Sequence, residues 1–142
     1  MPLPSINQIP YNLYRSSSWA QTVAWCQRNG VTVNAYSPFG VPDVKNGASG
    51  YPASGGMAPV MLNDPVLAAI AAAHGRTPAA VVSNWLWQLG IPFNPRSMNT
   101  EHMAENIGAF DFVLSGADIA KLSSRPQDWC DIDGKWYECA PV

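Results

Sequence analysis

An aromatic ring and a hydroxyl group stand where a short apolar run ends. The run covers residues 31–36 and closes on Tyr36, which is followed by the turn-like sequence Ser-Pro-Phe-Gly. A strand within a packed core gains nothing from such an ending, because a ring and a hydroxyl at its tip contribute little unless something contacts them. The pattern therefore predicts that a ligand binds at this strand end.

The segment that follows is rich in glycine and proline. Residues 38–62 have glycine at 40, 47, 50, 55 and 56 and proline at 38, 42, 52 and 59, without an apolar period. Loops of this length in compact domains are usually functional lids or disordered. The Gly-Ala-Ser-Gly sequence at residues 47–50 has neither the lysine of a Walker loop nor the context of a nucleophile elbow. We therefore expect no catalytic nucleophile here.

Three short runs that have strand character must position this site. They cover residues 5–11, 31–36 and 91–94. A helix is predicted over residues 18–29, because its apolar residues are spaced by four and three positions. Gly30 follows this helix where a left-handed C-terminal cap is favoured. A strand, a helix and a strand with short connectors favour a parallel sheet.

Further helices are predicted from their caps and stops. Asn63 or Asp64 caps the first and Thr77 the second, and each has proline at its first helical position. A third has an acidic first turn, and the last opens on Ser115 and Asp118 in capping-box form. These helices cover residues 65–75, 77–90, 100–106 and 115–124.

Composition excludes several classes of function. The 142 residues are 47% apolar and 13% charged, with a net charge of −2 and with lysine and arginine scattered singly. No basic cluster is present for nucleic acid or an anionic membrane, and no apolar run suits a signal peptide or a membrane span. We expect one cytoplasmic domain over residues 1–125 and a tail over residues 126–142.

The cysteines do not predict a metal site. Cys26, Cys130 and Cys139 lack metal-ligand spacing, and neither histidine lies near them in sequence. Cys130 and Cys139 flank a predicted hairpin whose turn is Asp-Gly at residues 133–134. A disulfide between them stays open, although reduced thiols are favoured in a cytoplasmic protein.

Two other residue types have structural interpretations. His74 precedes the glycine that stops a helix, where an imidazole complements the helix dipole, so we expect no catalysis from it. Helical spacing places the tryptophans mostly in the core. They are Trp19, Trp25, Trp85 and Trp87.

Five short motifs occur in a fixed order along the chain. They are Ile6-Asn-Gln, Tyr36-Ser-Pro-Phe-Gly-Val-Pro-Asp, Pro95-Arg-Ser, Ala104-Glu-Asn and Phe110-Asp-Phe. In order and spacing, over about residues 5–124, the chain resembles the C-terminal half of the aldo-keto reductases, which have Val-Asn-Gln, Tyr-Ser-Pro-Leu-Gly-Ser-Pro-Asp and Pro-Lys-Ser. The resemblance implies a partial (β/α)8 TIM barrel, its C-terminal portion, with about three parallel strands and flanking helices.

The resemblance also implies an NADP site with no catalytic residue and no metal. Tyr36 would stack on the nicotinamide ring, and Gln8 would hydrogen-bond its carboxamide. Ser37, Phe39 and Asp43 would line the pyrophosphate. The remaining implied cofactor residues precede or lie on the helix that starts near residue 100, and they are Arg96, Ser97, Asn99, His102, Glu105 and Asn106.

Departures from the family pattern affect the cofactor contacts. Arg96 replaces a lysine, and its forked, permanently charged donors suit a 2′-phosphate, which favours NADP over NAD. His102 replaces an arginine and gives up a charge-assisted contact worth roughly 1.5–3 kcal/mol. Val41 replaces a serine that reaches the pyrophosphate. We therefore expect weaker cofactor binding than is usual in the family.

By the same resemblance, the family's catalytic Asp, Tyr, Lys and His lie on its first four strands, whereas this chain begins at the sixth. Without the tyrosine as proton donor, carbonyl reduction would lose on the order of a hundred- to ten-thousand-fold. Three strands also cannot close a barrel. We expect open strand edges at residues 5–11 and 91–94 and wet inner faces on the helices.

Two functions follow from these expectations. In the first, which the resemblance implies, the chain would be the cofactor-binding portion of an NADPH-dependent reductase of aldehydes and ketones, inactive without an N-terminal half. Alternatively, it is a catalytically dead, truncated paralogue that binds a nucleotide or a protein. The implied partners are a carbonyl substrate, if the barrel is completed, and a protein that covers the open edges, but neither nucleic acid nor membrane. A fragment with no role of its own also stays open.

Overall fold

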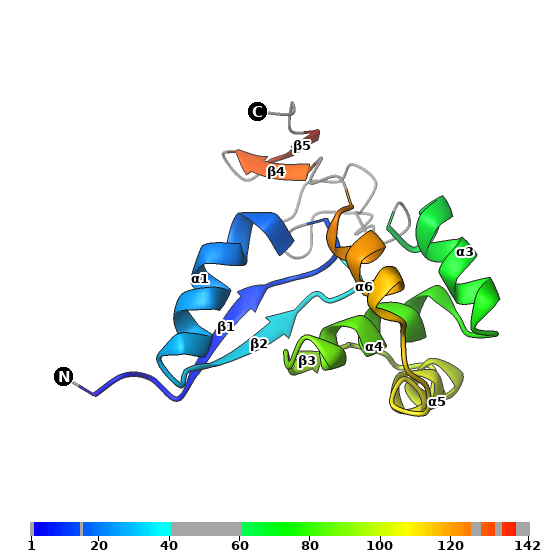
Figure 1. Cartoon of the computed structure of the whole chain (residues 1–142), viewed down its shortest axis with the longest axis horizontal. Coiled ribbons are helices and arrows are strands. Elements are labelled where there is room, and N and C mark those ends of the chain that lie inside the picture. The colour runs from blue at the N-terminus through cyan, green and yellow to red at the C-terminus, as the bar shows by residue number, and fades with distance from the viewer. Residues whose placement is uncertain (1, 15, 41–60, 126–128, 133–134, 139–142) are drawn as a thin grey trace.

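A three-stranded sheet lies at the centre of the fold. The computed structural model describes residues 2–14, 16–40, 61–125, 129–132 and 135–138. The sheet consists of β1 (Ile6–Pro10), β2 (Thr32–Tyr36) and β3 (Phe93–Asn94), in the order β1-β2-β3 (Figure 1). Both neighbouring pairs are parallel, which confirms the predicted sheet.

The third strand is shorter than predicted, with two residues instead of four. Pro92 has no N–H to give to the ladder. Its carbonyl still accepts a hydrogen bond from the Ala35 amide at 2.7 Å. The run therefore follows β2 as expected but pairs with it as a strand only at its end.

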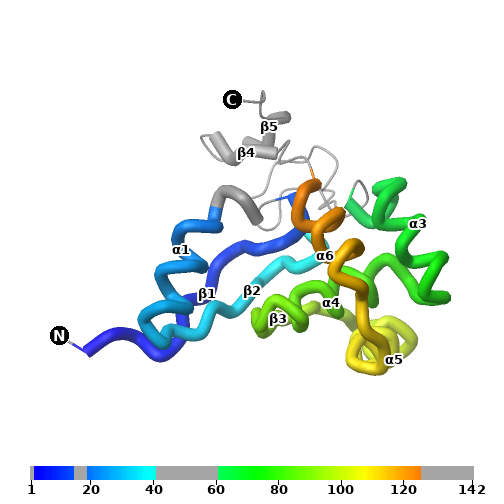
Figure 2. The backbone as a smooth tube through the Cα atoms, viewed as in Figure 1, coloured from blue at the N-terminus to red at the C-terminus, as the bar shows by residue number. Residues whose placement is uncertain are grey.

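Helix α1 (Ser16–Arg28) links β1 to β2. Val23 and Cys26 are buried in the core, and Gly30 ends the helix at a φ of 68°, a conformation that glycine adopts at little cost. In Figure 2, α1 lies beside β1, while the other helices gather at the opposite side of β2.

The central helices of the core are α3 (Pro65–Ala73) and α4 (Pro78–Gln88). Asp64 and Thr77 accept hydrogen bonds from their first-turn amides, as predicted. Helix α4 is the more deeply buried of the two. Its fully buried apolar side chains are Val81, Val82, Trp85 and Leu86.

Two shorter helices, α5 (Thr100–Gly108) and α6 (Gly116–Ser123), follow β3. Ser115 and Asp118 form the predicted capping box at the start of α6, in which each side chain accepts from the other's backbone amide. Asp118 Oδ2 also lies 3.1 Å from Nε2 of His74, the C-cap of α3. The imidazole therefore joins the ends of two helices.

Two expectations about buried surfaces are wrong. Trp85 is in the core and Trp19 packs against it, but Trp25 and Trp87 are each 45% exposed. The spacing of apolar residues predicts that a segment is a helix. It does not predict which side of that helix is buried by neighbouring elements. The inner faces of α1, α3, α4 and α6 are not wet either, because they form the core with one face of the sheet. Helix α5 alone among the described helices has no buried residue.

The tail contains β4 (Trp129–Ile132) and β5 (Lys135–Glu138), which pair antiparallel with Ile132 opposite Lys135. This confirms the predicted hairpin. Its turn and Cys139 lie outside the described residues, and the Cys130 side chain does too. Cys26 is a free, buried thiol.

No single helix in the described part is long and apolar enough to cross a membrane. Helices α3 and α4 reach that length only together, as a pair bent by 87°.

Candidate functional site

The three strands end together at one edge of the sheet. Pro10 is in register with Tyr36, and Tyr36 is in register with Asn94. Because the strands are parallel, the segments that follow all leave from this edge. The segments expected to bind a ligand after β1, β2 and β3 are therefore brought to one side of the molecule.

Gln8 and Tyr36 lie on the same open face of the sheet. Side chains alternate between faces along a strand, and Ile9, Val33 and Ala35 are buried on the helix side. Gln8 is exposed, and Tyr36 is 37% exposed, on the other side. A ring and an amide on one uncovered face can stack on and hydrogen-bond to the same flat ligand.

The turn after β2 has a strained backbone. Ser37 has a φ of 50°, in the left-handed region that costs an L-residue roughly 1–2 kcal/mol. Its carbonyl accepts from the Gly40 amide at 3.0 Å and from Asn12 Nδ2 at 3.2 Å. Phe39 is partly buried against the core. The turn is thus held in place from two sides.

Asn12 is a site residue that the sequence analysis missed. It is 1% exposed, and its Oδ1 accepts from the Tyr14 amide at 3.1 Å while its Nδ2 reaches Ser37. An acceptor two residues before the amide forms an Asx turn. The signal available was an asparagine directly after a predicted strand, where this residue type often turns the chain.

The loop between β3 and α5 brings together three of the predicted residues. Arg96 and Asn99 are exposed and Ser97 is half-buried. Asn99 Oδ1 accepts from the amides of Glu101 (2.8 Å) and His102 (3.4 Å), so it caps α5. Ser97 Oγ accepts from the Asn99 amide at 3.1 Å. The asparagine therefore satisfies the Glu101 and His102 amides of α5, which leaves these two donors less available to an anion.

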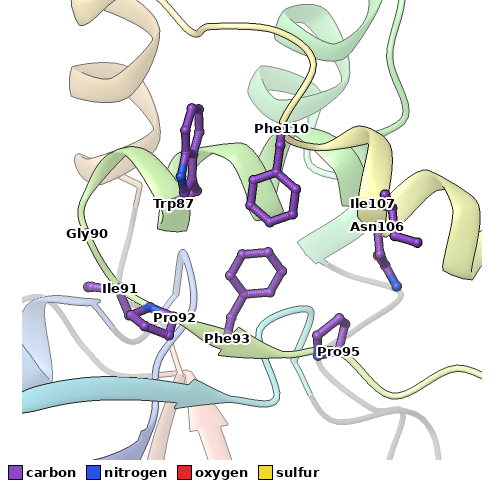
Figure 3. A pocket seen from close by; sticks show the side chains of 9 residues that line it. All are labelled: Trp87, Gly90, Ile91, Pro92, Phe93, Pro95, Asn106, Ile107 and Phe110. Atoms are coloured by element: carbon purple, nitrogen blue, oxygen red, sulfur yellow. The ribbon is translucent and has the colours of Figure 1, made fainter.

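The other predicted cofactor residues lie along α5 or outside the described residues. His102 is exposed on the first turn of α5, and Glu105 and Asn106 are half-buried farther along it. Asn106 is at the wall of a pocket formed by α4, β3 and α5 (Figure 3). Asp43 lies outside the described residues. The cofactor roles of all these residues stay predictions.

A buried ion pair anchors the chain next to this edge. Asp64 is 3% exposed, and its Oδ2 accepts from the Tyr14 hydroxyl at 2.8 Å and from Arg125 Nη2 at 2.7 Å. Its Oδ1 caps α3 through the Val66 and Leu67 amides. The sequence predicted a helix cap at Asn63 or Asp64 and no ion pair, because partners 50 and 61 positions away leave no local pattern.

This environment shifts two pKa values. Burial raises the pKa of the Asp64 carboxyl, but the hydrogen bonds from Tyr14, the Leu67 amide and Arg125 outweigh it, so the pKa is lowered overall. Burial and then the bond to Asp64 raise the pKa of Tyr14, and burial also raises that of Tyr11. Neither phenol is tuned toward donating a proton near neutral pH. Within the described residues, no group of acidic, histidine and cysteine side chains could hold a metal.

Comparison with known proteins identifies similar chains. The aldo/keto reductase family profile matches residues 2–125. The chain is 31% identical over 138 residues to aldo-keto reductase family 1 member A1 of Mus musculus, covering 93% of this chain and 40% of that protein. It is 37% identical over 120 residues to morphine 6-dehydrogenase of Pseudomonas putida, covering 84% and 38%. The chain thus spans about two fifths of the relatives' length.

Solved structures are similar too. An aldo-keto reductase of the silkworm, Bombyx mori, is 35% identical to this chain, with a TM-score of 0.69. The match covers 88% of this chain and 35% of the silkworm chain. A mutant of Gox0644 in complex with NADPH is 24% identical with a TM-score of 0.68, covering 88% and 39%, and indicates the fold alone. These neighbours are TIM barrels. The predicted fold class, a part of such a barrel, is confirmed.

Proposed function

The chain belongs to the aldo/keto reductase family over residues 2–125, and on that premise we propose that it is the cofactor-binding portion of an NADPH-dependent reductase of aldehydes and ketones. Members of this family use NAD(P)H. The observation that carries the proposal is the common edge at which Pro10, Tyr36 and Asn94 end three parallel strands in register. Ligands of parallel barrels bind at this edge.

The residues at this edge fit the parts of a pyridine dinucleotide. Tyr36 offers a 37% exposed ring for the nicotinamide, and Gln8 offers an amide on the same face for its carboxamide. We assign the turn at Ser37 and Phe39, which follows Tyr36, to the pyrophosphate, together with Asp43, which lies outside the described residues. When bound, the cofactor would supply a hydride, and these side chains would hold its ring against the open face of the sheet.

The loop before α5 supports NADP rather than NAD. Arg96 is exposed and carries a forked guanidinium. Ser97, with its hydroxyl, and Asn99, with its side-chain amide, are close to it in the sequence. We place the 2′-phosphate here, with His102, Glu105 and Asn106 along α5 toward the adenosine. Because Asn99 Oδ1 already accepts from the Glu101 and His102 amides, the charge of Arg96 would supply most of the phosphate affinity.

We further propose that the described part is inactive on its own. A phenol that donates a proton to a carbonyl needs a lowered pKa, whereas Tyr11 and Tyr14 have raised ones. Activity would then require the strands that carry the family's catalytic residues. A cytoplasmic location accompanies this proposal, supported by the free thiol of Cys26.

Titration of the purified chain with NADPH and with NADH, followed by tryptophan fluorescence and calorimetry, tests the proposal. We expect saturable NADPH binding that is at least about tenfold tighter than NADH binding. One charged contact that contributes about 1.4 kcal/mol to binding gives this factor. Binding of neither nucleotide up to millimolar concentration would refute the cofactor role. Reduction of an aldehyde after adding the remaining barrel portion separates an enzyme part from the alternative, a catalytically dead binding module.

A further inference from the structure

The side chain of Asn34, on β2, has a buried oxygen that pairs with nothing among the described residues. The Oδ1 atom is closed to solvent and has no hydrogen-bond partner there, although the residue as a whole is only half-buried. Buried polar atoms are nearly always hydrogen-bonded, because an unpaired one costs the folded state free energy. The family motifs quoted above do not include Asn34, so its oxygen needs an explanation of its own.

Asn34 lies on the open face of the sheet, at the level of Gln8. Side chains alternate along a strand, and Val33 and Ala35 on either side of Asn34 are buried toward the helices, so Asn34 points to the other face. Strands β1 and β2 run side by side (Figure 1), and their register pairs Asn34 with Gln8. Neighbouring strands are about 4.8 Å apart. Two amide side chains therefore lie next to each other on this face.

Ser83 has the other buried oxygen without a partner in the described part of the chain, but its surroundings differ. It is 0% exposed within α4, so a ligand could reach its hydroxyl only if the core opened. Asn34 is instead followed, two positions later on the same face, by Tyr36, whose ring is 37% exposed. Access to a ligand separates the two residues.

A primary carboxamide complements the pair of amide side chains. It has one acceptor oxygen and an NH2 group with two donors. Gln8 can donate from Nε2 to the oxygen, and Asn34 Oδ1 can accept from the NH2 group. Tyr36 is about 6.6 Å further along β2 than Asn34. A flat ring that stacks on Tyr36 and has an amide substituent can therefore reach both side chains.

We propose that Asn34 selects the cofactor by its carboxamide. Its Oδ1 accepts a hydrogen bond from the NH2 group of the nicotinamide carboxamide, while Gln8 donates to the carbonyl oxygen of the same group. This inference rests on the proposed function and adds a specificity residue and a division of roles to its site. The bond gives the buried oxygen of Asn34 a partner, so a ring substituent without an N–H binds less well.

Two cofactors that differ at this group alone test the assignment by titration of the full chain, followed by tryptophan fluorescence and calorimetry. They are NADPH and the reduced 3-acetylpyridine analogue of NADPH, in which a methyl group replaces the NH2 group and the carbonyl stays. We expect wild type to bind NADPH at least about tenfold more tightly than the analogue. Asn34→Leu should weaken NADPH binding by that factor and leave the analogue unchanged. Gln8→Leu should weaken both equally, because both keep the carbonyl.

The control variant is Thr32→Val, which changes an exposed side chain on the same face of β2, two positions before Asn34. It should keep the preference for NADPH. The urea midpoint of Asn34→Leu without cofactor is a second readout. Because leucine removes an unpaired buried oxygen, the midpoint should stay the same or rise while NADPH affinity falls. A residue with a merely structural role would lose both together.

Three outcomes would overturn the inference and leave the proposed function in place. They are an unchanged preference for NADPH in Asn34→Leu, an equal weakening of both cofactors, and a fall of the urea midpoint in both Asn34→Leu and Asn34→Val. The second variant is included because a β-branched side chain suits a strand. If the wild-type chain binds neither cofactor, the proposed function and this inference fail together.

Discussion

The side-chain amide of Asn12 donates a hydrogen bond to the main-chain carbonyl of Ser37 across 3.2 Å. This contact joins the loop after β1 to the turn after β2. Since Ser37 has a left-handed backbone, the turn needs support from its surroundings to persist. The buried asparagine supplies it from a neighbouring strand end, so two segments at the candidate site are held together.

Asn12→Ala should lower the free energy of unfolding by about 1–3 kcal/mol, because the Tyr14 amide loses a buried acceptor. It should also weaken NADPH binding through the released Ser37 turn. Urea denaturation and a cofactor titration measure the two effects. The matched control is Asn29→Ala, which removes an exposed bond to the Trp25 carbonyl and should cost within about 0.5 kcal/mol. Equal losses would contradict a supporting role for Asn12.

Tyr36→Leu should reduce NADPH affinity roughly 5- to 150-fold, since stacking of a base-like ring on an aromatic side chain contributes about 1–3 kcal/mol. Tyr36→Phe keeps the ring and should bind like wild type. The residue is 37% exposed, so neither change should alter the urea midpoint much. Fluorescence or calorimetric titration distinguishes them, and similar affinities for leucine and phenylalanine would exclude stacking.

Arg96→Gln should weaken NADPH binding about 10- to 150-fold, the loss expected for a charge-assisted contact of about 1.5–3 kcal/mol. Binding of NADH, which lacks the 2′-phosphate, should stay unchanged and serves as the internal control. His102→Arg restores the residue type of the family and should strengthen NADPH binding alone. Equal effects of Arg96→Gln on the two cofactors would place the 2′-phosphate elsewhere.

Asp64→Asn should destabilise the protein at neutral pH. Breaking a buried ion pair costs about 3–5 kcal/mol, and this is an upper bound here because the Arg125 side chain is 21% exposed to solvent. The folded state lowers the Asp64 pKa below its ordinary value of 3.8. The stabilisation is therefore complete above that value and is lost as pH falls through the lower folded-state pKa.

The difference in unfolding free energy between wild type and Asp64→Asn should accordingly shrink below about pH 4, measured by urea denaturation from pH 7 to pH 2. The control is Asp118→Asn, whose carboxyl also has a lowered pKa, from bonds with Ser115 and His74. It should cost only about 0.5–2 kcal/mol, as a helix cap does. A difference for Asp64→Asn that stays constant with pH would show that its charge does not matter.

Local signals in the sequence predicted most elements of the fold. Asp64, Thr77 and Ser115 each begin a helix because their side chains accept bonds from nearby amides, a property that is visible over four residues. Gly30 and Gly90 end helices for an equally local reason, a positive φ. The parallel direction of β1 and β2 followed from the short connectors around α1. The place of β3, which begins at Phe93, followed only from the family resemblance.

Features that depend on distant partners were not predictable in this way. The bond from Arg125 to Asp64 spans 61 positions, and the exposure of Trp87 depends on whether a neighbour covers its face of α4. Asn12 could have been suspected as a turn residue, but its contact with Ser37 requires two strand ends to meet. The site residues were named from family motifs, and their cofactor roles await the titrations above.

The segment 41–60 begins and ends at fixed points. Gly40 is buried at one side of it, and Met61 (0% exposed) and Asp64 are held by the core and the ion pair at the other. Because the closure entropy of a loop rises only slowly with its length, a change in the number of residues between these two points should cost the folded state little free energy while both points stay in place. Segments of different length from relatives should therefore be accepted between Gly40 and Met61 without unfolding the domain.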